Sequence, residues 1–145
     1  MGGTVKITQI ETFLVRPASR NYVFLRVQTD EGIYGVGEAY SVGPDEAVVA
    51  VIADFASWLV GRDPRDIEFL WQLMYNASRF PGGVVTNAAI SGIEHALWDI
   101  KGKALGVPVY ELLGGKQRDH IRTYIHAGGA TPEELAENAA ERLAR

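Results

Sequence analysis

Three arginines in segments predicted to be loops carry the side chains best suited to binding an anionic small molecule. Arg16 and Arg20 lie in the polar connection at residues 16–21, and Arg79 opens the segment at residues 79–83. A guanidinium presents several N–H donors in a planar fork, which matches a carboxylate or a hydroxyl-rich substrate. Arginine is also common on loop surfaces, so a plain surface position is the alternative for each.

A second group of polar residues, Glu94, His95 and Asp99, falls within one predicted helix. The spacing of four between His95 and Asp99 could direct two ligands to one metal ion. A metal site needs a third and a fourth donor, and the sequence shows no HExxH pattern or acidic cluster nearby to supply them. We therefore expect His95 and Asp99 to make hydrogen bonds at the edge of a packed helix.

Glycines 32, 35 and 37 resemble part of a nucleotide-binding loop, which must stand between a strand and a helix of a parallel unit. Here they lie in a predicted hairpin. Close packing of the backbone is therefore the better explanation for them.

The stretch at residues 86–115 contains the most strongly predicted helix. Its apolar residues recur at intervals of three and four, which places them on one face: Ala89, Ile90, Ile93, Leu97, Ile100, Ala104 and Leu105. Gly106 is predicted to end this helix in the left-handed conformation. Pro108 cannot continue it but can open the next helical segment, at residues 109–113.

Upstream, alternating apolar and polar residues predict strands at 5–15, 22–29 and 33–38, which would form a three-stranded antiparallel meander. Helical spacing predicts two helices, at residues 46–60 and 66–76. The expected fold class is α+β, a meander combined with a helical bundle.

Downstream, residues 121–127 predict a short strand, and a helix is predicted from Pro132 to Arg145. Thr131 and Glu134 have the spacing of a capping box, with Pro132 at the first helical position. Strand, turn and helix in this order correspond to the first unit of a (β/α) barrel, which would need seven more units to close.

Composition excludes several classes of protein. The 145 residues are 47% hydrophobic with a net charge of −4, and the basic residues are scattered, which argues against nucleic acid and anionic membranes as partners. There is no cysteine, so disulfides and thiolate chemistry are excluded. No apolar run reaches transmembrane length, and Lys6 breaks the myristoylation pattern suggested by Met1-Gly2-Gly3. We expect a cytoplasmic protein.

The run IEHALWDIKGKALGVPVYELLGG at residues 93–115 resembles the signature that closes the N-terminal capping domain in the mandelate racemase and muconate-lactonising branch of the enolase superfamily. The resemblance extends over essentially the whole chain. It implies a capping domain at residues 1–118, followed at 119–145 by the first strand and helix of a truncated TIM barrel.

For a full-length relative, the resemblance implies removal of the proton α to a carboxylate by a Lys or His base, with the intermediate held on Mg²⁺. Dehydration of an acid sugar, as in galactonate- or mannonate-dehydratase-like members, is the expected reaction, and a racemase or cycloisomerase is the alternative. No metal ligand or catalytic base for this chemistry is expected in these residues, so we expect the 145-residue chain alone to be inactive. A free-standing binding or assembly module is a further alternative, which the reading frame downstream of Arg145 would test.

The resemblance also places substrate specificity in the loops of the capping domain. It implies a structural hydrogen-bonding role for Glu38 at the interface with the barrel, with a catalytic role as the alternative. His126 would lie at the active-site end of the first barrel strand and contact substrate, or else be a half-buried strand residue. The predicted substrate-binding residues are Arg16, Arg20, Tyr22, Tyr40, Arg79 and His126.

Family members carry a Lys-x-Lys pair on a barrel strand, where side chains two residues apart share a face. Lys101 and Lys103 have that spacing but fall in a predicted helix, where they diverge, so we expect no catalytic pair. A homo-oligomer acting on a small acid sugar is expected. Residues 119–145 lack barrel neighbours, and we expect them to be mobile or to order against a second copy.

Overall fold

The computed structural model describes residues 5–17, 20–40, 43–77 and 79–144. It divides into two units, Met1–Gly115 and Lys116–Arg145, which are taken here one at a time. Some predictions fall outside the described residues: the N-terminal motif at 1–3, two positions in each of the loops 16–22 and 40–45, and the last residue of the terminal helix. The domain division after residue 118 stays a prediction.

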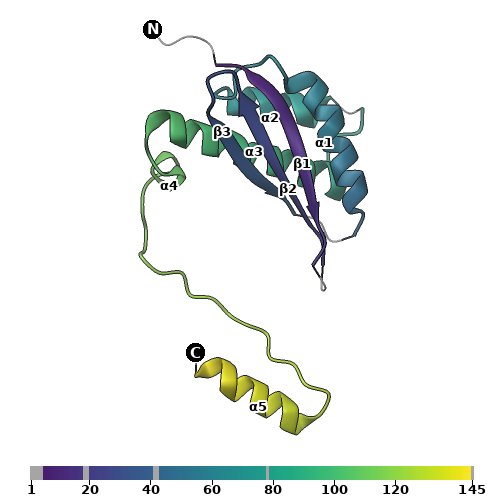
Figure 1. Cartoon of the computed structure of the whole chain (residues 1–145), viewed down its shortest axis with the longest axis vertical. Coiled ribbons are helices and arrows are strands. Elements are labelled where there is room, and N and C mark those ends of the chain that lie inside the picture. The colour runs from purple at the N-terminus through teal and green to yellow at the C-terminus, as the bar shows by residue number, and fades with distance from the viewer. Residues whose placement is uncertain (1–4, 18–19, 41–42, 78, 145) are drawn as a thin grey trace. The chain divides into compact units, whose positions relative to one another are not determined.

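The first unit contains an antiparallel sheet with the strand order β1-β2-β3 (Figure 1). β1 spans Ile7–Val15, β2 spans Tyr22–Thr29 and β3 spans Tyr34–Ala39. Because side chains alternate along a strand, one face of β2 is buried, through Val23, Leu25 and Val27. The predicted three-stranded meander is confirmed.

Four helices complete the described part of this unit: α1 (Asp45–Leu59), α2 (Ile67–Asn76), α3 (Val84–Leu105) and α4 (Val109–Leu112). The first three share one hydrophobic core with the inner face of the sheet, and Figure 1 shows them on one side of it. The predicted stripe of α3 supplies much of that core. Its most deeply buried large side chains are Ile93, Leu97 and Ile100. The expected α+β fold class is thus observed.

α3 lies unusually close to β3 because glycines line the contact. A Cβ atom added to Gly35 would lie 1.9 Å from the carbonyl oxygen of Ala96, and one added to Gly37 would lie 2.0 Å from that of Gly92. Gly92 in turn faces Ala39, whose backbone would be 2.9 Å from an added Cβ. The glycines of β3 therefore serve close backbone packing, as the hairpin context predicted.

The end of α3 also follows the sequence. Gly106 has a φ of 69°, in the left-handed region, and its N–H donates to the carbonyl groups of Gly102 and Lys103. Pro108 then precedes the first residue of α4. The local chemistry of glycine and proline explains this helix end without help from the rest of the fold.

The second unit contains helix α5 (Pro132–Leu143), with the predicted capping box. The Thr131 hydroxyl accepts a hydrogen bond from the N–H of Glu134 at 3.2 Å, and the Glu134 carboxylate accepts from the N–H of Ala130 at 2.8 Å. The strand predicted at residues 121–127 was wrong, because this segment has no regular secondary structure. A strand needs a neighbour for its backbone hydrogen bonds, and the described residues of this unit form no other strand.

Candidate functional site

Four side chains meet where the connection from β1 to β2 lies beside the end of β3. The guanidinium carbon of Arg20 lies 4.4 Å from the ring centroid of Tyr22 and 5.1 Å from that of Tyr40. One of its nitrogens, Nη2, lies 3.8 Å from Oε1 of Glu38. We call these four residues the Arg20 cluster.

The pairing of the strands brings this cluster together. Val23 of β2 is paired with Ala39 of β3, so the residues just outside this pair, Tyr22 and Tyr40, are neighbours at the same end of the sheet. Arg20 lies two residues before Tyr22, the first residue of β2. Residues far apart in the sequence thus converge through the antiparallel register.

The electrostatics of the cluster favour a positively charged Arg20 with accessible donors. Side-chain hydrogen bonding to Tyr22 is the main cause that raises the pKa of Arg20, and the interactions with Tyr40 act in the same direction. The aromatic rings attract the cation through their negatively charged faces. The Arg20 side chain is 45% exposed, so part of the guanidinium reaches solvent and can bind a carboxylate or a hydroxyl group.

The other predicted substrate-binding residues have different surroundings. Arg16 forms an ion pair with Glu46, and both side chains are well exposed. Arg79 is exposed in the connection that leads to α3. His126 lies in the second unit, where its ring makes an edge contact with Tyr124 at 5.2 Å between centroids. His126 does not end a strand, which removes the positional argument made for it.

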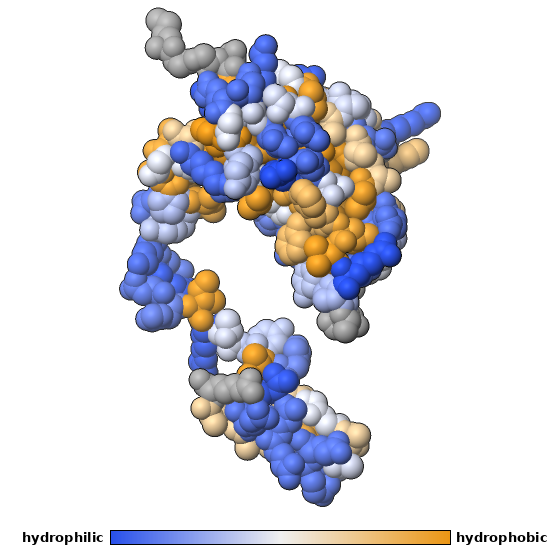
Figure 2. All heavy atoms as spheres, viewed as in Figure 1, coloured by the Kyte–Doolittle hydropathy of each residue, from blue (hydrophilic) through white to orange (hydrophobic). Residues whose placement is uncertain are grey.

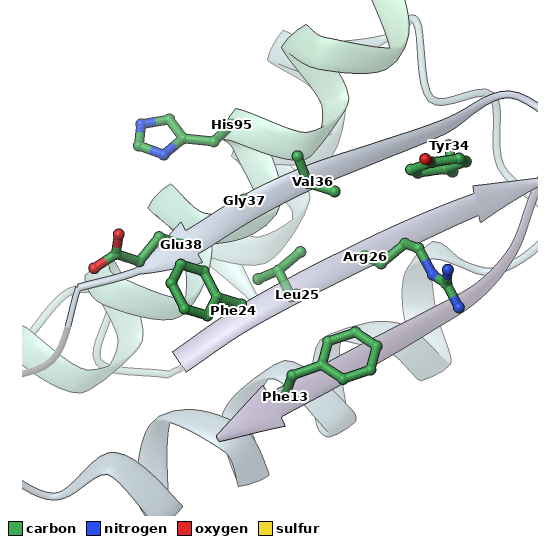
Figure 3. A pocket seen from close by; sticks show the side chains of 9 residues that line it. All are labelled: Phe13, Phe24, Leu25, Arg26, Tyr34, Val36, Gly37, Glu38 and His95. Carbon is green, nitrogen blue, oxygen red and sulfur yellow. The ribbon is translucent and has the colours of Figure 1, made fainter. Parts of the chain in front are cut away.

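The outer face of the sheet forms a shallow depression of about 570 Å³ (Figure 3). Phe13 pairs across the strands with Phe24, and Val36 pairs with Arg26; Phe13 is 46% exposed and Val36 is 53% exposed. Figure 2 shows hydrophobic side chains gathered on the visible surface of the first unit. This surface was not predicted from the sequence. The alternation along β2, which places Phe24 on the face opposite to Val23 and Leu25, was a signal for it.

The polar part of this face is internally paired. The Arg26 side chain donates to the Glu11 carboxylate at 2.9 Å, and Gln28 donates to the same oxygen, Oε2, at 2.6 Å. The hydrogen bond from Arg26, and then that from Gln28, lowers the pKa of Glu11. A carboxylate held in its charged form in this way is a poor proton donor at neutral pH.

The charged residues of α3 also have structural partners. Oδ2 of Asp99 accepts hydrogen bonds from the backbone N–H of Val36 at 3.0 Å and from Nζ of Lys103 at 2.7 Å. Lys103 also donates to the carbonyl oxygen of Tyr34 at 2.7 Å. Asp99 thus hydrogen-bonds at the edge of the packed helix, as predicted, and satisfies part of the outer edge of β3.

Lys101 points elsewhere. Its Nζ lies 3.5 Å from the carbonyl oxygen of Arg65 and 5.5 Å from the ring centroid of Trp98. The indole N–H of Trp98 donates to Glu94 at 3.3 Å. The two lysines therefore lie on a helix, as predicted, and contact different groups. That they form no catalytic pair stays a prediction.

The donor groups of the described residues do not fit Mg²⁺. Within residues 5–17, 20–40, 43–77 and 79–144, no three His, Asp or Glu side chains gather where they could hold a metal ion. Magnesium requires near-octahedral coordination by oxygen atoms, several of which are commonly water molecules. We therefore assign no catalytic step through a metal ion to these residues.

A three-stranded antiparallel meander with helices on one face is the fold of the N-terminal capping domain of the enolase superfamily, to which the structural neighbours belong. Residues 7–114 match the family described as mandelate racemase / muconate lactonizing enzyme, N-terminal domain. The chain belongs to this family.

The curated relatives include D-galactonate dehydratases. That of Verminephrobacter eiseniae is 48% identical over 139 residues, covering 96% of this chain and 36% of the relative. That of Xanthomonas campestris is 50% identical over 128 residues, covering 88% of this chain and 33% of the relative. The chain therefore spans about a third of the length of these enzymes.

Solved structures show the same fold. An enolase from Pantoea ananatis with bound D-gluconate and Mg is 42% identical, with a TM-score of 0.90, over 97% of this chain and 34% of that one. An enolase from Agrobacterium radiobacter, bound to Na and L-malate, is 38% identical, with a TM-score of 0.84, over 95% of this chain and 35% of that one. Both of these structures thus carry an acid ligand and a metal ion.

Proposed function

We propose that this chain is the capping part of an acid-sugar dehydratase, in which the Arg20 cluster contacts the substrate. The observation that carries the proposal is the cation of Arg20, held between two tyrosine rings but still partly open to solvent. A guanidinium in this state can bind the carboxylate or the hydroxyl groups of a sugar acid. The similarity to D-galactonate dehydratases supports this substrate class.

The reaction removes the proton from the carbon next to the carboxylate and hydroxide from the following carbon, so water is lost. The product enol becomes a 2-keto-3-deoxy acid. The reaction needs a base and electrostatic stabilisation of the charge that develops on the carboxylate. The part of the chain that the structure describes has no suitable cluster for this, so we propose that the chain binds and orients substrate and has no dehydratase activity alone.

In this proposal Tyr22 and Tyr40 have two roles in binding substrate. Their ring faces hold the guanidinium of Arg20, and their hydroxyl groups can donate to or accept from substrate hydroxyls. Glu38 limits the orientations of Arg20 through the ion pair. Base and metal ligands would come from the two thirds of the relatives' length that this chain does not span. A homo-oligomer in the cytoplasm is part of the same proposal.

A chimera tests the proposal. Residues 1–118 of this chain would replace the corresponding domain of the D-galactonate dehydratase from Verminephrobacter eiseniae. With D-galactonate and Mg²⁺ we expect release of a 2-keto acid, detected as its semicarbazone. The isolated 145-residue chain, assayed in parallel, should release none.

Two results with the chimera would contradict the proposal. One is a folded chimera that leaves D-galactonate, D-gluconate and galactarate unchanged. The other is a chimera that racemises or isomerises an acid without loss of water, which would favour the racemase or cycloisomerase alternative. Turnover by the purified 145-residue chain would refute the claim that it is inactive alone.

A further inference from the structure

The connection that carries Arg20 is fastened at both ends to the beginning of α1. Asn21, just before β2, donates from Nδ2 to Oδ2 of Asp45 at 2.7 Å. Arg16, just after β1, forms an ion pair with Glu46. Asp45 and Glu46 are the first two residues of α1, so one helix end holds both ends of the connection.

The two contacts differ in strength. The Asn21–Asp45 hydrogen bond has a charged acceptor and is partly buried, so water competes with it less than with the exposed pair, and we take it as the stronger of the two. The Arg16–Glu46 pair is largely exposed, with side-chain exposures of 62% and 73%, so water and salt weaken it. Acidic residues are also favoured in the first turn of a helix, where the backbone N–H groups carry partial positive charge. Asp45 and Glu46 thus stand in the first turn of α1, where their negative charge is favoured and where Asn21 and Arg16 contact them.

We infer that Asp45 and Glu46 are positioning residues, which hold Asn21 and Arg16 on either side of Arg20 and thereby set the place of Arg20. They act through Asn21 and Arg16 rather than on substrate. The consequence for substrate binding rests on the proposed function; the mechanical coupling between the two segments does not. The coupling predicts that a change at the start of α1 loosens the chain around Arg20.

Trypsin measures this loosening directly in the 145-residue chain. It cleaves after arginine, so the Arg20–Asn21 bond is a site, whereas the bond after Arg16 resists because Pro17 follows. Cleavage in a folded region requires local opening, so its rate reports the open population. Sites after Arg118 and Arg122, in the second unit, serve as internal references in every sample.

The variants separate the coupling from effects on the helix itself. Asp45→Ala removes the partly buried hydrogen bond to Asn21 and should raise the rate of cleavage after Arg20 about fivefold. Glu46→Gln removes only the exposed ion pair with Arg16, which contributes less, and should raise that rate about twofold. Asp45→Asn keeps an oxygen acceptor for Asn21 but removes its charge, so its cleavage rate should lie between those of the parent and Asp45→Ala. The matched control is Glu68→Gln, which removes an acid from the first turn of α2, where its side-chain partner is Gln72 of the same helix.

Equal cleavage after Arg20 in the parent, Asp45→Ala and Glu46→Gln would overturn the inference. So would an equal rise in Glu68→Gln, because the effect would then belong to helix ends in general. If Asp45→Ala unfolds the unit, which would expose Lys101 and Lys103 of α3 to cleavage, the comparison of Glu46→Gln with Glu68→Gln decides. The assay contains no substrate, so an inactive chimera would refute the proposed function and leave this result standing.

Discussion

The contact between β3 and α3 predicts that Gly37→Ala is strongly destabilising. The added Cβ would lie 2.0 Å from the carbonyl oxygen of Gly92, whereas ordinary contacts of a Cβ begin at 3.4 Å, so the strand and helix must separate by about 1.4 Å. Both partners are backbone and cannot rotate away. We expect a loss of about 3 kcal/mol, against a gain of at most about 1 kcal/mol from the less flexible unfolded chain.

Two further glycines calibrate this expectation. Gly92→Ala places its Cβ 2.9 Å from the backbone of Ala39, a smaller conflict, which a helix-propensity gain of about 1 kcal/mol partly offsets. Gly128→Ala meets nothing within 4 Å and is the control. In urea unfolding followed by tryptophan fluorescence, the loss of stability should be largest for Gly37→Ala, smaller for Gly92→Ala and smallest for Gly128→Ala. An unfolding midpoint for Gly37→Ala equal to that of the parent would refute the reasoning about this contact.

Three other predictions follow from local features of the structure. The hydrogen bond from Arg65 lowers the pKa of Asp63 below 3.8, so its stabilisation is present above that pH and is lost as the pH falls through the folded-state pKa. Asp63→Asn should therefore cost about 1 kcal/mol near neutral pH, and urea unfolding at a series of pH values should show the difference from the parent shrinking below pH 3.8; a difference independent of pH would contradict this. Replacing Lys101 and Lys103 by Gln in the chimera should leave kcat within about threefold, and a loss of about 10³ would show a catalytic pair. Thr131→Ala should destabilise α5 by about 1 kcal/mol, seen as reduced helical circular dichroism, and an unchanged spectrum would exclude the cap.

Local sequence signals predicted much of the first unit. The spacing of Ile93, Leu97 and Ile100 fixes which face of α3 is buried, and Gly106 marks its end, because both depend on backbone geometry within a few residues. The same local chemistry predicted the Thr131 cap of α5. The strand at residues 121–127 was wrong because a strand depends on a partner, which local pattern does not supply.

The candidate site was less predictable for the same reason. Arg20, Tyr22 and Tyr40 were each proposed from loop position or resemblance, but their meeting depends on the pairing of Val23 with Ala39. Arg16 was proposed as a substrate contact, which stays a prediction; its ion pair with Glu46, across 30 positions, could not be read from the sequence pattern. Such contacts join residues about 20 to 30 positions apart, which no periodicity reveals.

The central claim, that the Arg20 cluster contacts an acid sugar, is tested most directly by steady-state kinetics of the chimera on D-galactonate. Arg20→Gln should raise KM about tenfold with kcat within about threefold, because a binding contact is lost while the catalytic groups remain. The control Arg118→Gln lies outside the cluster and should match the parent chimera. An unchanged KM in a folded, active Arg20→Gln chimera would contradict the claim.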